Sequence, residues 1–260
     1  MYPGIGVIRG QKMDVAQTMN GPHIFEAGKG VLLDARRAVF LPALRTLAVA
    51  DLHLGYAWAQ RRRGQLLPIA PPDDTLPRLR ALCADWNPEV VVVLGDFVHA
   101  AADVEGIRAA VSDVLGGLPA SVRWEIVLGN HDHRLPARLA EWGLQVPCHP
   151  SLDTGGFRFV HGDVLPPEPM PSAWTLSGHE HPALVLGDGG TTSLRVPAFL
   201  VGERRVILPP FSNWAAGSVV GRQPFLGEWA RRSRFRAAVA CLGPRLLPIP
   251  WERLPGVGAV

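Results

Sequence analysis

The first half of the chain alternates short apolar runs with amphipathic segments. Asp73 or Asp74 can cap a helix that runs to about Trp86, and further helical segments are expected at Tyr56–Arg63 and Val104–Leu115. The apolar runs between them, typical of buried strands, are Thr46–Asp51, Glu89–Leu94 and Trp124–Leu128. This alternation of strand and helix predicts an α/β sheet with parallel strands.

The second half is rich in short strands and turns. Phe157–Val160 and Trp174–Ser177 are short apolar strands, and a β-meander follows them. The meander strands are Ala183–Leu186, Ser193–Val201 and Arg204–Leu208. Further on, the basic segment Glu228–Ala240 is expected to form a helix.

No internal repeat and no linker divides the chain, so a single domain is expected. Residues 1–30 are rich in glycine and polar residues with weak periodicity, and we interpret them as a loosely ordered lead-in that ends in a first strand. Residues 31–221 would form the main domain. Residues 222–260 would be a C-terminal extension packed on that domain.

The composition changes this picture little. Hydrophobic residues at 47% and charged residues at 19% indicate a folded, soluble protein, and the net charge of +3 is too small to indicate a polyanionic partner. Three cysteines without CxxC spacing favour a reduced, cytoplasmic protein. Because no apolar run approaches the ~20 residues of a spanning helix and Met1–Lys12 lacks a signal-peptide core, no membrane association is expected.

Polar side chains follow each strand of the first half. Asp51 and His53 end the first run, and residues i and i+2 of an extended segment point to the same face. Asp96 follows the second run, and Asn130-His131-Asp132 follows the third. Since α/β sheets place ligand sites at the carboxyl ends of their strands, these side chains are expected to meet.

The second half adds imidazoles at equivalent places, and the whole set has the chemistry of a metal site. Carboxylate, imidazole and amide oxygen suit divalent Mn, Fe, Zn or Co, and the lack of a thiolate argues against a structural zinc site. There are too many groups for one ion and about enough for two that share a carboxylate. The set is Asp51, His53, Asp96, Asn130, His131, His161, His179 and His181.

Each motif alone has an ordinary explanation. Asp-x-His is commonly an inconsequential strand end, Gly-Asp is a common turn, and a lone His161 is more often a satisfied polar residue. Five such motifs in order, each after an apolar strand-like run, are far less compatible with coincidence. We therefore interpret them as one constellation.

These motifs resemble those of the calcineurin-like metallophosphoesterase superfamily, over about residues 46–182. The resemblance implies a four-layer α/β/β/α sandwich of two mixed sheets, with a dinuclear metal site at the strand C-terminal ends and a metallophosphoesterase domain over residues 31–221. One ion would be held by Asp51, His53 and His181, the other by Asn130, His161 and His179, and both by Asp96. His131 would be the proton donor or would stabilise the transition state, with Asp132 orienting it.

One branch of the superfamily is similar in more detail. Ala50–Gly55, the Gly-Asp-Phe-Val-His-Ala segment and Gly178–Pro182 resemble the ICC-like phosphoesterases, which include the bacterial ligase-associated DNA damage response endonucleases. Segments Arg195–Phe199 and Leu208–Phe211 extend this resemblance to about residue 217. The resemblance implies a nuclease of DNA repair.

Two further groups have open interpretations. His99 stands three residues after Asp96, where repair nucleases of the superfamily carry a phosphate-contacting histidine, and the alternative is a histidine beside the metals without substrate contact. The triplet Arg61, Arg62 and Arg63 is either a phosphate-binding rim or the solvated end of a helix.

The sequence thus predicts a metal-dependent phosphodiesterase acting on nucleic acid, DNA rather than RNA, with a hydroxide bridging the ions as nucleophile. The expected cofactor is a pair of divalent ions, manganese first, with Fe, Zn, Co and Mg as alternatives. DNA-repair proteins are candidate partners. Two alternatives stay open: a phosphoesterase acting on small nucleotides or cyclic nucleotides, and a non-catalytic metal-binding scaffold.

Overall fold

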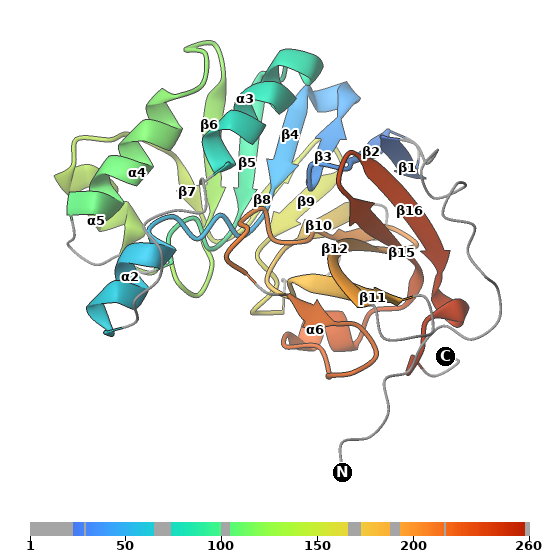
Figure 1. The fold of residues 1–260 in the computed structure, drawn as a ribbon. Coiled ribbons are helices and arrows are strands. Elements are labelled where there is room, and N and C mark those ends of the chain that lie inside the picture. The colour runs from blue at the N-terminus through green and yellow to red at the C-terminus, as the bar shows by residue number, and fades with distance from the viewer. Residues whose placement is uncertain are drawn as a thin grey trace.

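The computed structural model describes residues 23–28, 30–64, 74–99, 105–165, 173–187, 193–215 and 217–257. Most of the expected lead-in at residues 1–30 lies outside these ranges. Two mixed sheets pack face to face between helices, which gives the four-layer α/β/β/α arrangement implied by the resemblance (Figure 1).

The first sheet has seven strands in chain order. Its first three strands are antiparallel to their neighbours, and the strands from β4 onward are parallel. The parallel part confirms the alternation of strand and helix seen in the sequence. The strands are β1 (Ile24–Gly28), β2 (Val31–Asp34), β3 (Ala38–Leu41), β4 (Thr46–Val49), β5 (Val90–Leu94), β6 (Arg123–Val127) and β7 (Cys148–His149).

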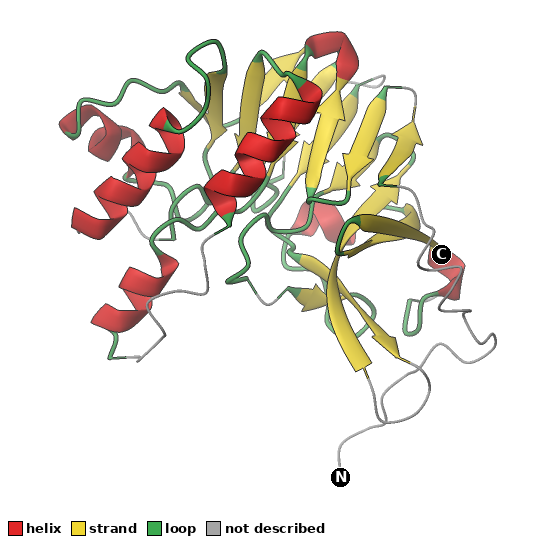
Figure 2. Cartoon of the chain, turned by 45° about the horizontal axis from the view of Figure 1, so that its top comes forward, coloured by secondary structure: helices red, strands yellow, loops and turns green. Residues whose placement is uncertain are grey.

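Helices cover the outer face of this sheet (Figure 2). Leu79 and Leu82 of α3 and Leu135 and Leu139 of α5 are buried in one core with the outward side chains of β4 and β5. Helix α5 was not predicted from the sequence because it is short and begins directly after the polar motif that ends at Asp132. The helices of this half are α2 (Tyr56–Arg62), α3 (Thr75–Trp86), α4 (Glu105–Gly116) and α5 (Leu135–Glu141), and Pro42–Leu44 forms the 3-10 turn η1.

The second sheet is also mixed, and its strands β9, β10 and β13 run parallel. Strand β12 is its longest member and pairs with β11, β13 and β15. The strands are β8 (Leu152–Thr154), β9 (Phe157–Val160), β10 (Trp174–Ser177), β11 (Pro182–Gly187), β12 (Ser193–Gly202), β13 (Arg205–Ile207), β14 (Ser218–Val219), β15 (Phe235–Leu242) and β16 (Arg245–Pro250).

Side chains of β4 alternate between two cores. Leu47 and Val49 face the helices, whereas Ala48 and Ala50 face the second sheet. Because successive side chains of a strand point to opposite faces, a strand buried on both sides is apolar at every position. This explains the unbroken apolar runs before Asp51 and Asp96, and it places both residues at the same edge of the sheet.

The helix expected at Glu228–Ala240 is wrong. Only α6 (Glu228–Arg231) is helical, and the chain then enters β15, which pairs with β12 on one side and β16 on the other. The alanines and arginines of this segment favour a helix locally, but burial of Val239 between the sheets and of Ala238 on the outer face outweighs that preference.

Residues beyond 221 therefore contribute to the second sheet and to the layer outside it. Trp229 and Ala230 of α6 pack on the outer face of that sheet, and the 3-10 turn η2 (Trp251–Arg253) follows β16. Within the described ranges, no helix is both long enough and apolar enough to span a membrane.

Candidate metal centre

The polar motifs converge where the parallel strands of both sheets end. Asp51 and His53 follow β4, Asp96 follows β5, and residues 130–132 follow β6. From the second sheet, His161 follows β9, and residues 179–181 connect β10 to β11. The site is therefore built by the facing edges of two sheets, as expected for ligand sites in α/β folds.

One group of donors surrounds the Nε2 atoms of His53 and His181. These atoms are 3.4 Å apart, and ligand atoms of these two residues, Asp51 and Asp96 all lie within 4.8 Å of one another. The Oδ1 atom of Asp51 is 3.4 Å from His181 Nε2, and Asp96 Oδ2 is 3.9 Å from His53 Nε2. Two carboxylates and two imidazoles at these distances suit a divalent cation.

A second group of donors lies on the other side of Asp96. His161 Nε2 is 3.1 Å from Asn130 Oδ1, 3.1 Å from His179 Nδ1 and 3.6 Å from Asp96 Oδ1. The two oxygens of the Asp96 carboxylate thus face different groups. All seven residues expected as metal ligands come together in these two groups.

The donors fit divalent metal ions. Ring nitrogens that face each other at 3.1 and 3.4 Å repel unless a proton or a cation lies between them. Burial works against charge on Asp51, but His181, His161 and His53 hold its pKa below the usual range. Burial, reinforced by the charge of Asp51, raises the pKa of Asp96. A cation between the two carboxylates would allow both to be ionised.

Two glycines of the motifs are required by close packing around the ligands. Gly95 has φ +76°, and a Cβ there would lie 2.0 Å from His161 Nδ1. A Cβ on Gly129 would lie 2.4 Å from Asp96 Oδ1. Since non-bonded atoms do not approach so closely, any side chain at either position would displace a donor.

The backbone at the ligands differs from the extended geometry assumed for Asp51 and His53. Both have positive φ, 55° and 47°, as do Asp96 at 47°, His179 at 68° and His181 at 46°. The two side chains still share the site, but a turn brings them there rather than the pleat of a strand. Left-handed conformations cost non-glycine residues energy, and such strain concentrates at functional sites.

His131 lies at the open side of the donor groups. Its backbone N–H donates to Asp96 Oδ1 at 3.0 Å, and its Nδ1 lies 2.6 Å from the carbonyl oxygen of His99. Because a carbonyl only accepts, Nδ1 carries the hydrogen and Nε2 remains for substrate. His131 Nε2 is 3.9 Å from Asp96 Oδ2, and the side chain is 37% exposed, so an incoming group can reach it.

Asp132 does not orient His131, which corrects the expectation from the sequence. Its fully buried carboxylate accepts three backbone N–H groups, from Phe97 at 3.1 Å, Val98 at 3.2 Å and Gly129 at 3.0 Å. The orienting contact to His131 comes instead from the His99 carbonyl. Asp132 therefore ties the loop after β5 to the loop after β6.

His99 lies between Tyr56 and His131, with ring centroids at 4.6 Å and 5.1 Å. Its Nδ1 is buried, with no hydrogen-bond partner in the described part of the chain. Burial, with the charges of His131 and Arg63, lowers the pKa of His99 to about 4. The ring is thus neutral at pH 7, and its contact with a substrate phosphate stays a prediction.

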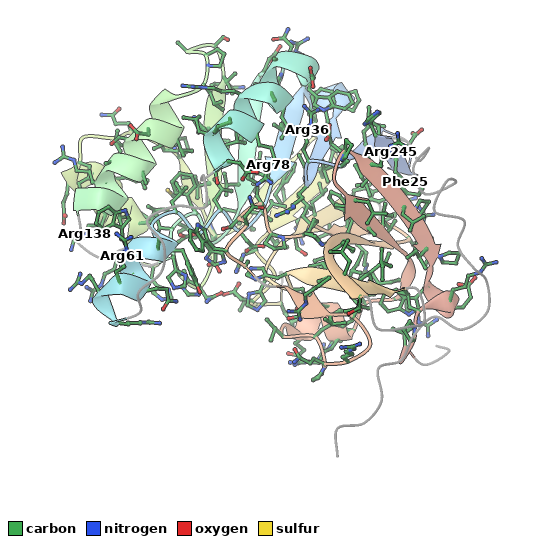
Figure 3. All side chains as sticks on the ribbon, in the orientation of Figure 1. Phe25, Arg36, Arg61, Arg78, Arg138 and Arg245 are labelled. Atoms are coloured by element: carbon green, nitrogen blue, oxygen red, sulfur yellow. The ribbon has the colours of Figure 1, made fainter. Side chains whose placement is uncertain are left out.

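The arginine triplet ends helix α2. Arg61 lies at the edge of the molecule, with its guanidinium 5.8 Å from the Trp58 ring, and Arg62 is exposed (Figure 3). Arg63 is also exposed, but its charge acts on His99. Which of the three arginines meets a substrate stays a prediction.

Glu180 holds a segment of the C-terminal part of the chain against the ligand loops, a role that the sequence motifs do not indicate. Its side chain, 2% exposed, accepts the backbone N–H groups of Leu226 and Gly227, both at 2.7 Å. A Cβ on Gly227 would lie 2.4 Å from the carbonyl oxygen of Gly162, which follows His161. Residues 226–227 therefore fill the space between two ligand loops. The position of Glu180 between two ligand histidines was the only signal in the sequence.

Comparisons with known proteins agree with this geometry. The calcineurin-like phosphoesterase family matches residues 44–171. The crystal structure of the Pseudomonas putida nuclease MPE is similar, with 28% sequence identity and a TM-score of 0.60 over 84% of this chain and 94% of that chain. The structure of YfcE, a phosphoesterase from E. coli, has 16% sequence identity and a TM-score of 0.35, over 76% of this chain and 88% of that chain. No curated protein sequence matched.

The fold and the donor set define a metal-dependent phosphoesterase. Over residues 44–171 the chain is similar to the calcineurin-like phosphoesterases, and over most of its length it is similar to a nuclease of known structure.

Proposed function

We propose that the protein is a nuclease that hydrolyses phosphodiester bonds of DNA with two divalent metal ions. The observation that carries the proposal is the position of Asp96, whose two carboxylate oxygens face two separate groups of donors. The similarity to a nuclease over most of both chains supports nucleic acid as the substrate.

We assign the ligands by these two groups. One ion would be held by Asp51, His53 and His181, the other by Asn130, His161 and His179, and Asp96 would contact both. When bound, the ions would activate water and neutralise charge that develops on the phosphoryl oxygens. The native metal is proposed to be manganese, because carboxylate, amide and imidazole donors without thiolate suit it.

His131 is proposed as the proton donor to the leaving oxygen. Its Nδ1 donates a hydrogen bond to the His99 carbonyl oxygen, so only Nε2 can exchange a proton with the substrate. The same hydrogen bond stabilises the protonated ring, because the N–H of an imidazolium is the stronger donor. His99 itself would contact a phosphate next to the cleaved bond.

We further propose a role in DNA repair in the cytoplasm. The resemblance of residues 50–55 and 178–182 to ligase-associated endonucleases supports the role in repair. The three cysteines, Cys83, Cys148 and Cys241, are unpaired, as is usual in a reducing compartment. Other repair proteins are the expected partners.

A metal-screened hydrolysis assay tests the proposal. The protein would be loaded with Mn, Mg, Fe, Co or Zn and incubated with single- and double-stranded DNA, RNA, nucleotides, cyclic nucleotides and bis-p-nitrophenyl phosphate. We expect cleavage of DNA, fastest with manganese. Hydrolysis of nucleotides without cleavage of polymers would identify a small-molecule phosphoesterase, and metal binding without turnover of any substrate would identify a scaffold.

A further inference from the structure

Two aromatic rings stack beside the metal centre. Tyr56 is the first residue of α2, and Trp214 lies in the loop after β13. Their ring centroids are 5.5 Å apart, and their planes differ by 23°. Both side chains are half-buried, so part of the aromatic surface faces solvent.

Both rings are anchored to the segments that carry metal ligands. The backbone N–H of Tyr56 donates to the carbonyl oxygen of His53 at 3.1 Å. The backbone N–H of Trp214 donates to Ser212 Oγ at 3.1 Å, and the N–H of Ser212 donates to the carbonyl oxygen of Asp51 at 3.2 Å. The stacked pair is therefore fixed relative to the first donor group.

The loop that carries Trp214 is held from the other side as well. The guanidinium of Arg78, at the start of α3, lies 4.0 Å from the Phe211 ring and donates to the Phe211 carbonyl (Figure 3). Arg37 donates to the carbonyl oxygens of Pro210 and Ser212. This network limits the movement of the loop, so the position of the Trp214 ring is defined before any substrate binds.

Ring contacts continue from this pair to the proposed catalytic histidines, first edge-on between Tyr56 and His99, with planes 62° apart, and then stacked between His99 and His131. The Tyr56 ring contacts His99 at 4.6 Å between centroids, and His99 stacks on His131 at 5.1 Å with planes 25° apart. A row of rings thus runs from the proposed proton donor to Trp214. A nucleotide whose phosphate lies at His131 would have its neighbour beside this row.

The polar atoms of the pair are the Tyr56 hydroxyl and the Trp214 indole N–H. In the described part of the chain, neither the Tyr56 hydroxyl nor the Trp214 indole N–H has a hydrogen-bond partner. Two other indoles do donate: Trp124 to the Leu115 carbonyl and Trp86 to the Asp34 carboxylate, whereas the buried Trp229 has no such bond within the described residues.

We propose that Tyr56 and Trp214 form a stacking platform for a nucleobase adjacent to the cleaved phosphodiester bond. The inference rests on the proposed nuclease function and adds a contact to the base, whereas the metals and His131 act on the phosphate. Every base has a flat π face, and stacking on an aromatic side chain contributes about 5- to 150-fold in affinity per base.

Abasic substitution in a single-stranded oligonucleotide tests the platform. The metal-loaded protein would cleave one labelled DNA sequence and a series in which one nucleotide at a time lacks its base, and kcat/KM would be compared. We expect one position next to the cleaved bond at which loss of the base lowers kcat/KM by about tenfold. In Tyr56→Leu and Trp214→Leu the ratio of kcat/KM for the intact substrate to kcat/KM for the abasic substrate should fall toward one, because the platform is gone.

Two further variants separate stacking from folding. Trp214→Phe keeps an aromatic face and should keep most of the ratio. Trp58→Leu removes another aromatic side chain of α2, one that is 46% exposed and lies outside the stack, and should leave the ratio as in the wild type. Three outcomes overturn the platform. In the first, the wild type cleaves the intact and abasic substrates equally well at every position. Alternatively, the ratio of kcat/KM with and without the base persists in both leucine variants, or it falls equally in Trp58→Leu. If bis-p-nitrophenyl phosphate is hydrolysed but no oligonucleotide is cut, the nuclease function fails and the platform with it.

Discussion

His131 Nδ1 and the carbonyl oxygen of His99 lie 2.6 Å apart, so the imidazole proposed as proton donor is oriented by the backbone of another histidine. The contact fixes the tautomer of His131 and aims its Nε2 toward the donor groups. It also separates two functions of His99: its carbonyl positions His131, whereas its ring contacts Tyr56. A substitution at His99 removes the ring and its contacts with Tyr56 and His131, but it leaves the carbonyl that positions His131.

Replacement of His131 by alanine should leave metal content unchanged and slow turnover by roughly 10²–10⁴-fold, the usual contribution of a positioned general acid. Metal analysis and kcat on a phosphodiester measure the two effects. His133→Ala is the matched control, because His133 is exposed two residues further along. Loss of metal from the His131 variant would show that this residue is a ligand.

Asp96→Asn should reduce the metal content from two ions per chain to fewer than one. An amide brings no negative charge and only one oxygen, whereas Asp96 faces both donor groups with two. Elemental analysis after gel filtration gives the stoichiometry. Treatment of the wild type with a chelator should abolish activity, and added manganese should restore it. Two ions retained by the variant would contradict the shared position of Asp96.

Asp132→Asn should lower the free energy of unfolding by about 1–3 kcal/mol, the cost of leaving a buried donor without a partner. The carboxylate accepts three N–H groups, but a carboxamide turns its own NH2 toward at least one of them. Urea denaturation measures the loss. Asp113→Asn, on the exposed side of α4, should change stability by less than about 0.5 kcal/mol. Equal stability of both variants would mean that the loops after β5 and β6 do not depend on this contact.

Arg63→Ala should raise KM for DNA and flatten its salt dependence by about 0.7 in the logarithmic slope, as expected for one phosphate contact on a single strand. Its charge acts on His99, beside the site. Arg123→Ala is a suitable control because Arg123 begins β6, at the opposite end of the strand from Asn130. A salt series on single-stranded DNA gives the slopes. If Arg63→Ala and wild type have parallel slopes, the triplet is the solvated end of a helix.

The metal centre was predictable because its signals are local in the sequence. Asp51 and Asp96 each follow an unbroken apolar run, and strands buried on both faces leave such runs in any α/β sheet. The parallel order of β4, β5 and β6 then brings the polar residues to one edge. Neither step requires knowledge of contacts between distant segments.

Three of the failures depend on distant segments. Whether residues 235–242 form a strand is decided by pairing with β12 and β16, and local composition favours the helix instead. Asp132 stands next to His131 in the sequence, but its three donors come from two loops. Tyr56 and Trp214 lie far apart in the sequence, and no periodicity of the sequence reveals that their rings stack.

The contact of Glu180 with residues 226–227 means that the metal centre is completed by a segment that is synthesised after all of its ligands. A chain emerges from the ribosome N-terminus first, so all seven proposed ligands exist before Leu226 is made. A fragment that stops earlier would carry every ligand but lack the amides that hold the loop between His179 and His181. Unfinished translation products would then be poor at gathering metal.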